Sequence, residues 1–303
     1  MSDTKRTVLI FGAGGFTGRH LADSLSKSGR WIVEDARAQG ADLTDIGSLA
    51  RAVDSARPDA VINLAARSSV TESHLRLLYD VNAFGWRNLL TVLVERQFQG
   101  RVIFASSANI YGNKTDGLIV EQRPPDPANH YGLSKVLAER FSLLDGVGLD
   151  LVTTRPFNCI GVGQAPGFLV PKLVAHFAER RPRIELGALD VERDFVDIRD
   201  AAAAYTLLLE ADAPPPVVHI ASGCAVSIQA LIDILRGLTG HAMEVAVNQA
   251  FMRPNDLRYQ CGDVSRLASL GFIPRYTVTD TLSWMLNAQP AKASPRSEFD
   301  QAR

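Results

Sequence analysis

Short apolar runs rich in β-branched residues alternate, along the first half of the chain, with longer segments of helical periodicity. The strand-like runs are residues 7–11, 31–35, 60–64, 101–105 and 149–154. Apolar positions recur with helical spacing in residues 16–28, 45–56, 71–97 and 130–144. Strands that alternate with helices indicate right-handed crossovers in a parallel sheet. The expected fold class is therefore α/β, a Rossmann-like doubly wound parallel sheet.

The alternation weakens after about residue 165, where prolines stand at 166, 171 and 182 and again at 214–216. We expect residues 1–165 to form the main domain, with late strands contributed from about residues 190–222. Residues 166–290 are expected to form a smaller C-terminal region that binds substrate. Residues 291–303 are polar and aperiodic, which favours a disordered tail.

The composition excludes several classes of protein. The 32 lysines and arginines nearly balance the 33 acidic residues, so net charge gives no reason to expect binding to nucleic acid or a membrane surface. The three cysteines are too few and too scattered for a disulfide framework or a zinc site, so we expect no metal. The N-terminus leaves no room for a signal peptide, and no apolar run reaches the roughly 18 residues of a membrane span. We therefore expect a cytoplasmic protein.

The first chemical motif is "FGAGGFTG", in which Gly12, Gly15 and Gly18 follow a predicted strand and open a predicted helix. Glycines at this spacing let the backbone approach a pyrophosphate, which then binds the free amides of the first helical turn at Phe16 and Thr17. The alternative is a tight turn without a ligand. The next strand ends in the acidic pair "ED", as the dinucleotide-binding fingerprint requires.

That acidic pair bears on the choice between NAD and NADP. A carboxylate such as Asp35 binds the 2′-hydroxyl of the adenosine ribose and repels a 2′-phosphate, which favours NAD. Arg19 and Arg37 lie close by in sequence and could hold a 2′-phosphate, which favours NADP. Both arginines could equally be solvated surface residues. The choice between NAD and NADP stays open.

The second motif is "YGLSK", which places Tyr131 and Lys135 one turn apart on the same face of a predicted helix. A nearby ammonium group favours the phenolate, so we expect the pKa of Tyr131 to lie below its ordinary value of about 10. Ser106 and Ser107 follow the fourth predicted strand, at the edge where parallel sheets bind ligands. A serine there could polarise a carbonyl group while the tyrosine supplies a proton. The alternative is a pair of surface residues.

These motifs resemble those of the extended short-chain dehydrogenase/reductases of the NAD-dependent epimerase/dehydratase family. Further segments extend the resemblance in the same order: "DLTD", "INLAA", "VNAFGWRNLL", "SSANIYG", "RPFNCIGVGQ", "RDFVDIRD" and "GDVSRLASLGFIP". The resemblance implies a nucleotide-sugar enzyme whose catalytic residues are Ser107, Tyr131 and Lys135, with Lys135 also on the nicotinamide ribose. It further implies that Asp42 and Leu43 border the adenine, that Leu64, Ala65 and Ala66 lie along the cofactor, and that Asn82 is a structural asparagine.

The family contains epimerases, 4,6-dehydratases and 4-keto reductases that share one catalytic triad. Related dehydratases carry acidic residues after the catalytic hydroxyl, where this chain has Ala108 and Asn109. Neither side chain can shuttle a proton, which argues against a dehydratase unless another carboxylate substitutes.

The second half most resembles the GDP-4-keto-6-deoxy-mannose reductases, through "RPFNCIGVGQAPGFLVPKLV" and "IELGALDVERDFVDIRDAAAAY". The implied reaction transfers a hydride from NADH or NADPH to C4 of a keto sugar. Arg193 and Arg253 are the candidates for the substrate's pyrophosphate, because the planar fork of arginine suits phosphate oxygens. For Arg193 the alternative is an ion pair with Asp194 or Asp197.

In "RPFNCIGVGQ", the resemblance implies that Pro156 and Phe157 border the nicotinamide and that Asn158 contacts the sugar or its diphosphate. Asn109, Phe168 and Leu169 are further candidates for substrate contact. We interpret His130 as a capping or packing residue and Cys159 as a small apolar side chain. The resemblance also implies a homodimer formed through the helices around Leu89 and Tyr131.

Two alternatives to a reductase remain. A nucleotide-sugar 4-epimerase would keep NAD tightly bound and return the hydride to the opposite face of the sugar. A regulatory protein could bind the cofactor without turnover, although the complete set of Ser107, Tyr131 and Lys135 argues against it.

Overall fold

The computed structural model describes residues 5–68, 74–113, 117–251 and 258–289. At its centre lies a six-stranded sheet in which every neighbouring pair of strands is parallel. Its strands, in spatial order, are β10 (Val217–Ile220), β6 (Asp150–Pro156), β4 (Arg101–Ala105), β3 (Ala60–Asn63), β1 (Arg6–Phe11) and β2 (Trp31–Asp35). The strand order reverses direction between β1 and β3, so the carboxyl ends of these strands form the crevice where open sheets bind ligands.

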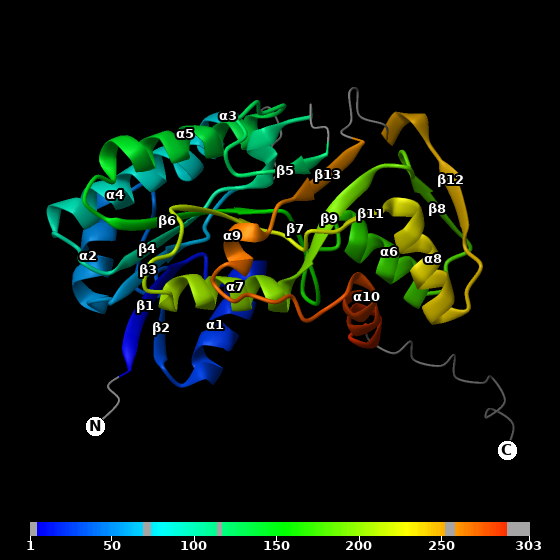
Figure 1. The fold of residues 1–303 in the computed structure, drawn as a ribbon, viewed down its shortest axis with the longest axis horizontal. Helices are drawn as coiled ribbons and strands as arrows, with labels where there is room; N and C mark the ends of the chain where they lie inside the picture. The colour runs from blue at the N-terminus through cyan, green and yellow to red at the C-terminus, as the bar shows by residue number, and fades with distance from the viewer. Residues whose placement is uncertain (1–4, 69–73, 114–116, 252–257, 290–303) are drawn as a thin grey trace, which may run out of the picture.

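Helices cover both faces of this sheet, which confirms the predicted doubly wound fold (Figure 1). One face carries α2 (Ile46–Ala56), α4 (Gly85–Glu95) and α5 (His130–Asp145), and the other carries α1 (Phe16–Ser28) and α7 (Ile198–Glu210). The three central strands β1, β3 and β4 are apolar and buried because helices press on them from both sides. The alanines of α7 let it pack closely against α1.

The segment predicted as one helix over residues 71–97 contains a π-helical turn. In the described part of this segment, α3 (Leu75–Tyr79) continues through the π-helix η2 (Asp80–Phe84) into α4. Gly85 follows this turn, and an added Cβ there would lie 2.7 Å from Cβ of Leu43. The helix is thus confirmed from residue 75 to residue 95, while residues 71–73 lie outside the described residues.

A second sheet lies beside the first. It contains β11 (Ala225–Ser227), β9 (Glu192–Asp197), β13 (Tyr259–Gly262) and β5 (Leu118–Ile119), with β7 (Asn158–Ile160) paired to β9. Of the late strands expected in the main sheet, β10 joins it, but β9 does not. The edge beyond β6 is taken by β10, and β9 pairs instead with β7, β11 and β13.

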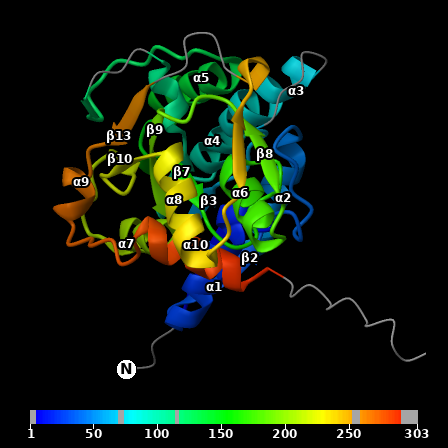
Figure 2. The same cartoon turned by 90° about the vertical axis from the view of Figure 1, so that its right-hand side faces the viewer.

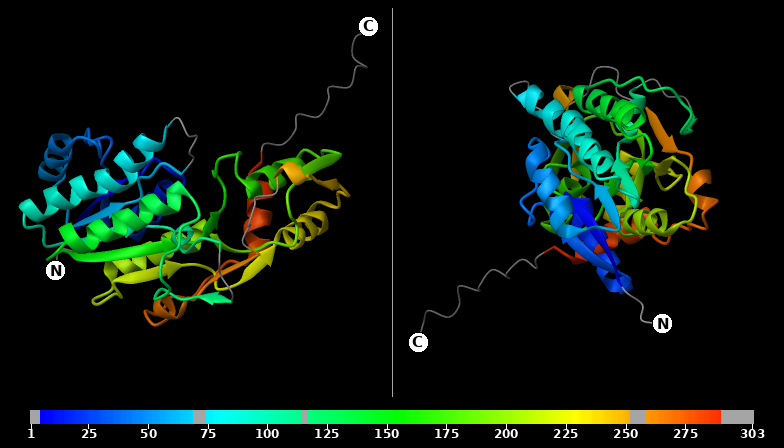
Figure 3. Two further views of the ribbon diagram at one scale, coloured as in Figure 1. Left: turned by 90° about the horizontal axis from the view of Figure 1, so that it is seen from above. Right: turned by 90° about the vertical axis from the view of Figure 1, so that its left-hand side faces the viewer.

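A smaller layer flanks the second sheet. It consists of α6 (Leu169–Ala178), α8 (Ile228–Thr239), α10 (Val278–Asn287) and the parallel pair β8 (Arg183–Leu186) and β12 (Glu244–Val247). Figure 2 views this layer end-on, and α6, α8 and α10 share one apolar core. Seen from above in Figure 3, this layer stands beside the main sheet and its helices. Strand β10 and helix α7 lie within residues 166–290, yet they pack into the core of the main sheet. The domain boundary at residue 165 stays a prediction.

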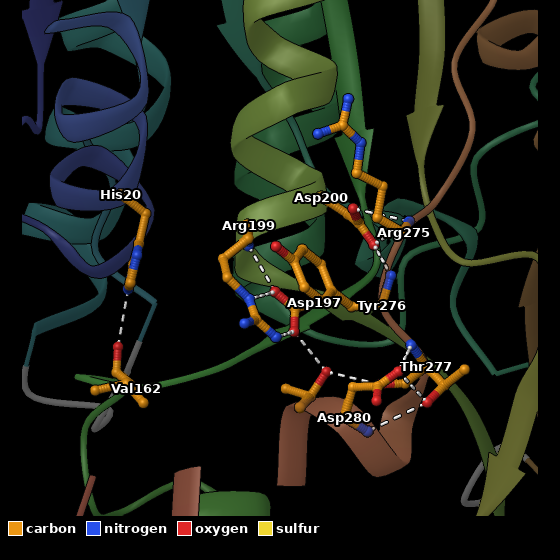
Figure 4. A network of polar contacts seen from close by, with 10 residues as sticks. His20, Val162, Asp197, Arg199, Asp200, Arg275, Tyr276, Thr277 and Asp280 are labelled. Carbon is orange, nitrogen blue, oxygen red and sulfur yellow. Dashed lines mark hydrogen bonds and ion pairs between the residues drawn. The ribbon is translucent and has the colours of Figure 1, made fainter. Parts of the chain in front are cut away.

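Helix α10 is attached to α7 through Arg199. The Arg199 guanidinium donates to both carboxylate oxygens of Asp197, at 2.9 and 2.7 Å, and lies against the ring of Tyr276 (Figure 4). It also lies 4.1 Å from the ring centre of Trp284 on α10. The Asp197 carboxylate also accepts a hydrogen bond from Thr281 on α10. Among the described residues, no helix combines the length and apolar character needed to cross a lipid bilayer.

Candidate active site

The glycine motif forms a tight loop between β1 and α1. Gly12 has φ of 84°, and a Cβ there would lie 2.8 Å from the backbone nitrogen of Ala65. A Cβ at Gly18 would collide with the carbonyl oxygen of Gly12. Gly15 precedes α1 without a side-chain cap, so the first-turn amides of Phe16 and Thr17 face the crevice uncapped. The loop therefore fits a bound pyrophosphate, as the sequence predicts.

Asp35 and Arg37 lie at the end of β2, where the ribose of a dinucleotide would sit. The Asp35 carboxylate accepts a hydrogen bond of 3.0 Å from the backbone nitrogen of Arg37, and the Arg37 side chain is exposed. Arg19, the other candidate for a 2′-phosphate, points elsewhere. Its guanidinium donates to the carbonyl oxygens of Gly163 and Gly14, at 3.0 and 3.4 Å. Arg37 is therefore the better placed of the two arginines.

Asn82 anchors the backbone that follows β3. Its side-chain oxygen accepts from the nitrogen of Arg67 at 2.8 Å, and its side-chain nitrogen donates to the carbonyl oxygen of Arg67 at 3.0 Å and to Ser134 at 3.1 Å. These bonds attach the Leu64, Ala65 and Ala66 segment to α5. The structural role that the resemblance implies for Asn82 agrees with this geometry.

Asp42 and Leu43 follow β2 in the chain, and their side chains differ in surroundings. Leu43 is buried against the helix that starts at Gly85, and its carbonyl oxygen accepts from Asn88. The exposed Asp42 carboxylate accepts from the backbone and side chain of Thr44, and these bonds lower its pKa. Their contact with an adenine ring stays a prediction.

The three predicted catalytic residues come together at the carboxyl end of β4. Ser107 follows this strand, is 5% exposed, and forms a side-chain hydrogen bond with Tyr131 from the start of α5. Asn109 also donates to the Ser107 hydroxyl, at 3.0 Å. One turn beyond Tyr131, the Lys135 ammonium is buried and donates to the carbonyl oxygen of Ala105 at 2.7 Å.

The expected lowering of the Tyr131 pKa is wrong for this structure. Burial raises the pKa of Tyr131, while the hydrogen bond with Ser107 acts in the opposite direction and is the smaller effect. Burial also lowers the pKa of Lys135 to about 7, against a smaller raising effect from Glu139. The Lys135 ammonium points to Ala105 and lies 5.0 Å from the Phe104 ring centre. Tyr131 is therefore protonated at neutral pH.

Ser106 is a site residue to which the sequence assigned no separate role. It precedes Ser107, is 2% exposed, and its hydroxyl has no hydrogen-bond partner among the described residues. A buried hydroxyl without a partner is costly, so a ligand group at this edge would satisfy it. Ser106 and the glycine loop both fit a dinucleotide at the carboxyl edge of the sheet.

The "RPFNCIGVGQ" segment leaves the main sheet at Pro156 and enters the second sheet at Asn158. Pro156 ends β6, but the ring of Phe157 is buried between Gly262 and His219, so its side chain is a core group. A nicotinamide contact by Phe157 would have to come from its backbone. Burial raises the pKa of Cys159 to about 12, in agreement with its interpretation as an apolar side chain.

Four of the predicted substrate residues line one cavity of 320 Å³. They are Asn158, Phe168, Leu169 and Arg193. The carboxylates considered as partners of Arg193 are engaged elsewhere. Asp194 accepts from the backbone and hydroxyl of Ser222, and Asp197 binds Arg199. Arg253, the other predicted phosphate ligand, lies outside the described residues.

His130 faces away from the catalytic pair. Its Nδ1 atom lies 2.9 Å from the hydroxyl of Tyr79, and the two rings meet edge to face. It packs against α3, as the sequence interpretation expects, and Asn129 caps α5 by accepting from the Gly132 nitrogen.

Comparisons with known proteins agree with this geometry. The GDP-6-deoxy-D-talose 4-dehydrogenase of Aggregatibacter actinomycetemcomitans is 32% identical over 89% of this chain and 93% of its own length. The GDP-6-deoxy-D-mannose reductase of Pseudomonas aeruginosa is also 32% identical, over 92% of this chain and 96% of its own.

Solved structures also resemble most of the chain. RMD from Pseudomonas aeruginosa, complexed with NADPH, has a TM-score of 0.84 at 30% identity and covers 93% of this chain and 98% of its own. The UDP-glucose 4-epimerase of Thermus thermophilus, complexed with NAD, has a TM-score of 0.80 at 27% identity, with coverage of 93% and 98%. The model of the NAD dependent epimerase/dehydratase family matches residues 8–221. With its doubly wound sheet, its glycine loop and its Ser107, Tyr131 and Lys135 cluster, the chain belongs to the NAD dependent epimerase/dehydratase family.

Proposed function

We propose that this protein reduces the C4 keto group of a nucleoside-diphosphate 4-keto-6-deoxy sugar, with GDP as the favoured nucleotide and NADH or NADPH as the reductant. Two relatives, each 32% identical, are named for oxidoreduction of GDP-linked 6-deoxyhexoses. Talose and mannose differ in configuration at C4. The two names thus point to hydride transfer at C4.

The residues of the catalytic cluster would stabilise the developing charge and supply the proton in this reaction. When bound, the reduced nicotinamide supplies a hydride to C4. Ser107 donates a hydrogen bond to the keto oxygen and stabilises the negative charge that develops there. Tyr131 transfers its phenolic proton to that oxygen, which leaves a C4 hydroxyl group and a tyrosinate. Lys135 is the group we propose for the nicotinamide ribose.

The two 32% identical relatives carry the proposal, and a protonated Tyr131 is consistent with it. A reductase needs a proton donor on its tyrosine at the start of the reaction, whereas oxidation of a sugar hydroxyl needs the phenolate as base. Burial holds the pKa of Tyr131 above its ordinary value, so the proton is present across the neutral range. Tyr131 can therefore supply the proton that reduction of a keto group consumes.

The positions that carry acidic residues in dehydratases support a reductase as well. Ala108 is buried and apolar, and the Asn109 amide donates to Ser107. Neither side chain can remove or supply the protons that elimination of water requires.

A 4-epimerase with tightly bound NAD is the second candidate, because the Thermus thermophilus neighbour is such an enzyme complexed with NAD. Purification separates the two candidates. A reductase releases its oxidised cofactor after each turnover, whereas an epimerase retains it, so nicotinamide absorbance that copurifies with the protein would favour the epimerase.

Substitution of the proton donor tests the reductase proposal. We expect Tyr131→Phe to lower the rate of keto-sugar reduction about 10²- to 10⁴-fold, the usual contribution of a general acid. Tyr79→Phe is a matched control, because this tyrosine contacts His130 on the neighbouring helix. Unchanged turnover in Tyr131→Phe would show that Tyr131 is not the acid.

We also propose a homodimer. On α5, Leu133, Leu137, Phe141 and Leu144 recur at helical spacing, and Leu133 and Leu144 are exposed. The exposed Phe84 on the adjacent helix contacts Phe141, which extends the apolar stripe.

A further inference from the structure

The turn formed by residues 161–164 is attached to the helix that follows the glycine loop. Arg19 of α1 donates to the carbonyl oxygen of Gly163 at 3.0 Å and, through its other terminal nitrogen, to that of Gly14 at 3.4 Å. His20, the next residue, places its Nε2 atom 2.8 Å from the carbonyl oxygen of Val162 (Figure 4). Two neighbouring side chains of α1 thus hold two consecutive carbonyl groups of the turn.

The backbone of the turn suits this attachment. Gly163 has φ of 87°, a conformation that favours glycine, and a Cβ there would lie 3.3 Å from the Arg19 guanidinium. The Gln164 nitrogen closes the turn by donating to the carbonyl oxygen of Gly161 at 3.3 Å. The position of Gln164 therefore depends on α1.

Gln164 lines the 320 Å³ cavity, and its side chain holds an unsatisfied acceptor. Its side-chain nitrogen donates to the carbonyl oxygen of Cys159 at 3.0 Å, which fixes the direction of the amide. Its Oε1 atom is buried and has no hydrogen-bond partner among the described residues. The cavity it lines also contains Asn158 and Arg193. A buried amide oxygen without a partner is costly, so a donor on the ligand would stabilise it.

The surroundings place this acceptor toward the sugar end of the cavity. Cys159, whose carbonyl oxygen anchors the Gln164 amide, lies three residues beyond Pro156 at the carboxyl end of β6, and β6 pairs with β4, the strand that leads to Ser107. Tyr131 acts on the sugar ring in the proposed function. The donor nearest to Gln164 would therefore be a hydroxyl group of the sugar and not the nucleotide base.

We propose that Gln164 accepts a hydrogen bond from a sugar hydroxyl group of the nucleotide-sugar substrate, and that Arg19 and His20 are positioning residues that hold it there. The inference rests on the proposed class of substrate, a nucleotide sugar. Because Arg19 also holds Gly14, the dinucleotide loop and the sugar-binding turn share one anchor. A sugar that offers no donor at this position would leave the amide oxygen unpaired and bind more weakly.

Calorimetric binding to the cofactor-free protein tests the role of Gln164. We expect Gln164→Met, which is apolar and of similar length, to weaken binding of GDP-6-deoxy-D-mannose about 3- to 10-fold, the range for one neutral hydrogen bond. Binding of GDP, which has no sugar hydroxyl beyond the diphosphate, should be unchanged and reports that the variant is folded. Equal affinities of wild type and variant for the sugar nucleotide, or equal weakening for GDP, would overturn the assignment.

A double-mutant cycle tests the positioning role of Arg19. Arg19→Met should weaken binding of GDP-6-deoxy-D-mannose in the wild-type background and have little further effect in Gln164→Met, because the two residues act through the same contact. Lys27→Met is the matched control, because Lys27 is an exposed cation on the same helix that pairs only with Asp23 in the described structure. Additive effects of Arg19→Met and Gln164→Met would overturn the positioning role.

Turnover by the wild-type protein separates this inference from the proposed function. If the wild type reduces GDP-4-keto-6-deoxy-D-mannose and Gln164→Met has an unchanged KM for it, the role of Gln164 is wrong and the reductase stands. If the wild type binds GDP-6-deoxy-D-mannose through Gln164 but reduces no keto sugar, the reductase is wrong and the role of Gln164 stands. Absence of binding to any nucleotide sugar would overturn both.

Discussion

Tyr131 shows what a residue pattern can and cannot predict. The spacing of Tyr131 and Lys135, and the serines after the fourth strand, identified side chains that the structure brings together. Their ionisation did not follow from the spacing, because it depends on where each side chain points. Lys135 donates to the backbone of Ala105, and burial controls the pKa of both groups. The same reason explains why Arg19 reaches Gly163 and not the ribose side.

His219 gives a prediction for stability against pH. This fully buried residue lies within a polar network, with Nε2 2.6 Å from the hydroxyl of Tyr111 and Nδ1 3.1 Å from the carbonyl oxygen of Asp263. Burial lowers its pKa to about 4, from an ordinary value of 6.5. Below pH 6.5 the unfolded chain binds a proton that the folded protein does not accept until about pH 4. Stability is therefore complete above pH 6.5 and falls as the pH drops toward 4, by about 3 kcal/mol in all.

Urea unfolding across this pH range measures the effect. The variant His219→Gln removes the titrating group, so its free energy of unfolding should change less between pH 6.5 and pH 4 than that of the wild type. Carboxylates that titrate in both proteins cancel in the comparison. The same pH dependence in the two proteins would contradict a neutral, buried His219.

At the scale of elements, apolar periodicity predicted the segments whose burial is uniform. Helix α1 has the predicted bounds, and the strands β2 and β4 match residue for residue. The apolar pattern of β9 could not show which sheet it joins, because that depends on which strand edges are free to pair with it. The π-helix η2 was not predicted either, because such turns are rare and occur as single turns within α-helices.

That π-helix carries Asn82, which leads to a test of stability. The Asn82 side chain makes three hydrogen bonds, two with the backbone of Arg67 and one with Ser134, while 1% exposed. Asn82→Leu keeps the volume but leaves these groups unpaired. We expect a loss of about 2–4 kcal/mol in the free energy of unfolding, together with weaker binding of NADH or NADPH. Asn88→Leu is the control. Asn88 lies on α4, which continues directly from η2, and its side chain donates one partly buried hydrogen bond, to the carbonyl oxygen of Leu43. An equal loss in both variants would contradict a special role for Asn82.

At the scale of the whole molecule, the apolar stripe on α5 predicts self-association. Leu144 is 73% exposed and continues the stripe of Leu133, Leu137 and Phe141, whereas Leu143 is 68% exposed on another side of the same helix. Leu144→Lys should shift the protein toward monomer, because it places a charge in the proposed interface. Leu143→Lys should leave the association state unchanged. Sedimentation analysis measures both, and a dimer unaffected by Leu144→Lys would contradict an interface through this stripe.

The molecule combines two features. The carboxyl edge of the main sheet fits a dinucleotide, and a cavity lies beside the second sheet. In the proposed function, the keto group of a sugar lies between this edge and this cavity and is reduced by NADH or NADPH. The decisive experiment is incubation of the purified protein with GDP-4-keto-6-deoxy-D-mannose and NADH or NADPH. We predict loss of reduced-nicotinamide absorbance in equimolar amount with the GDP-6-deoxyhexose formed. The proposal would be contradicted if the keto sugar were left unreduced while a nicotinamide cofactor copurified with the protein. In that case the protein would invert a nucleotide sugar at C4 without net consumption of reductant.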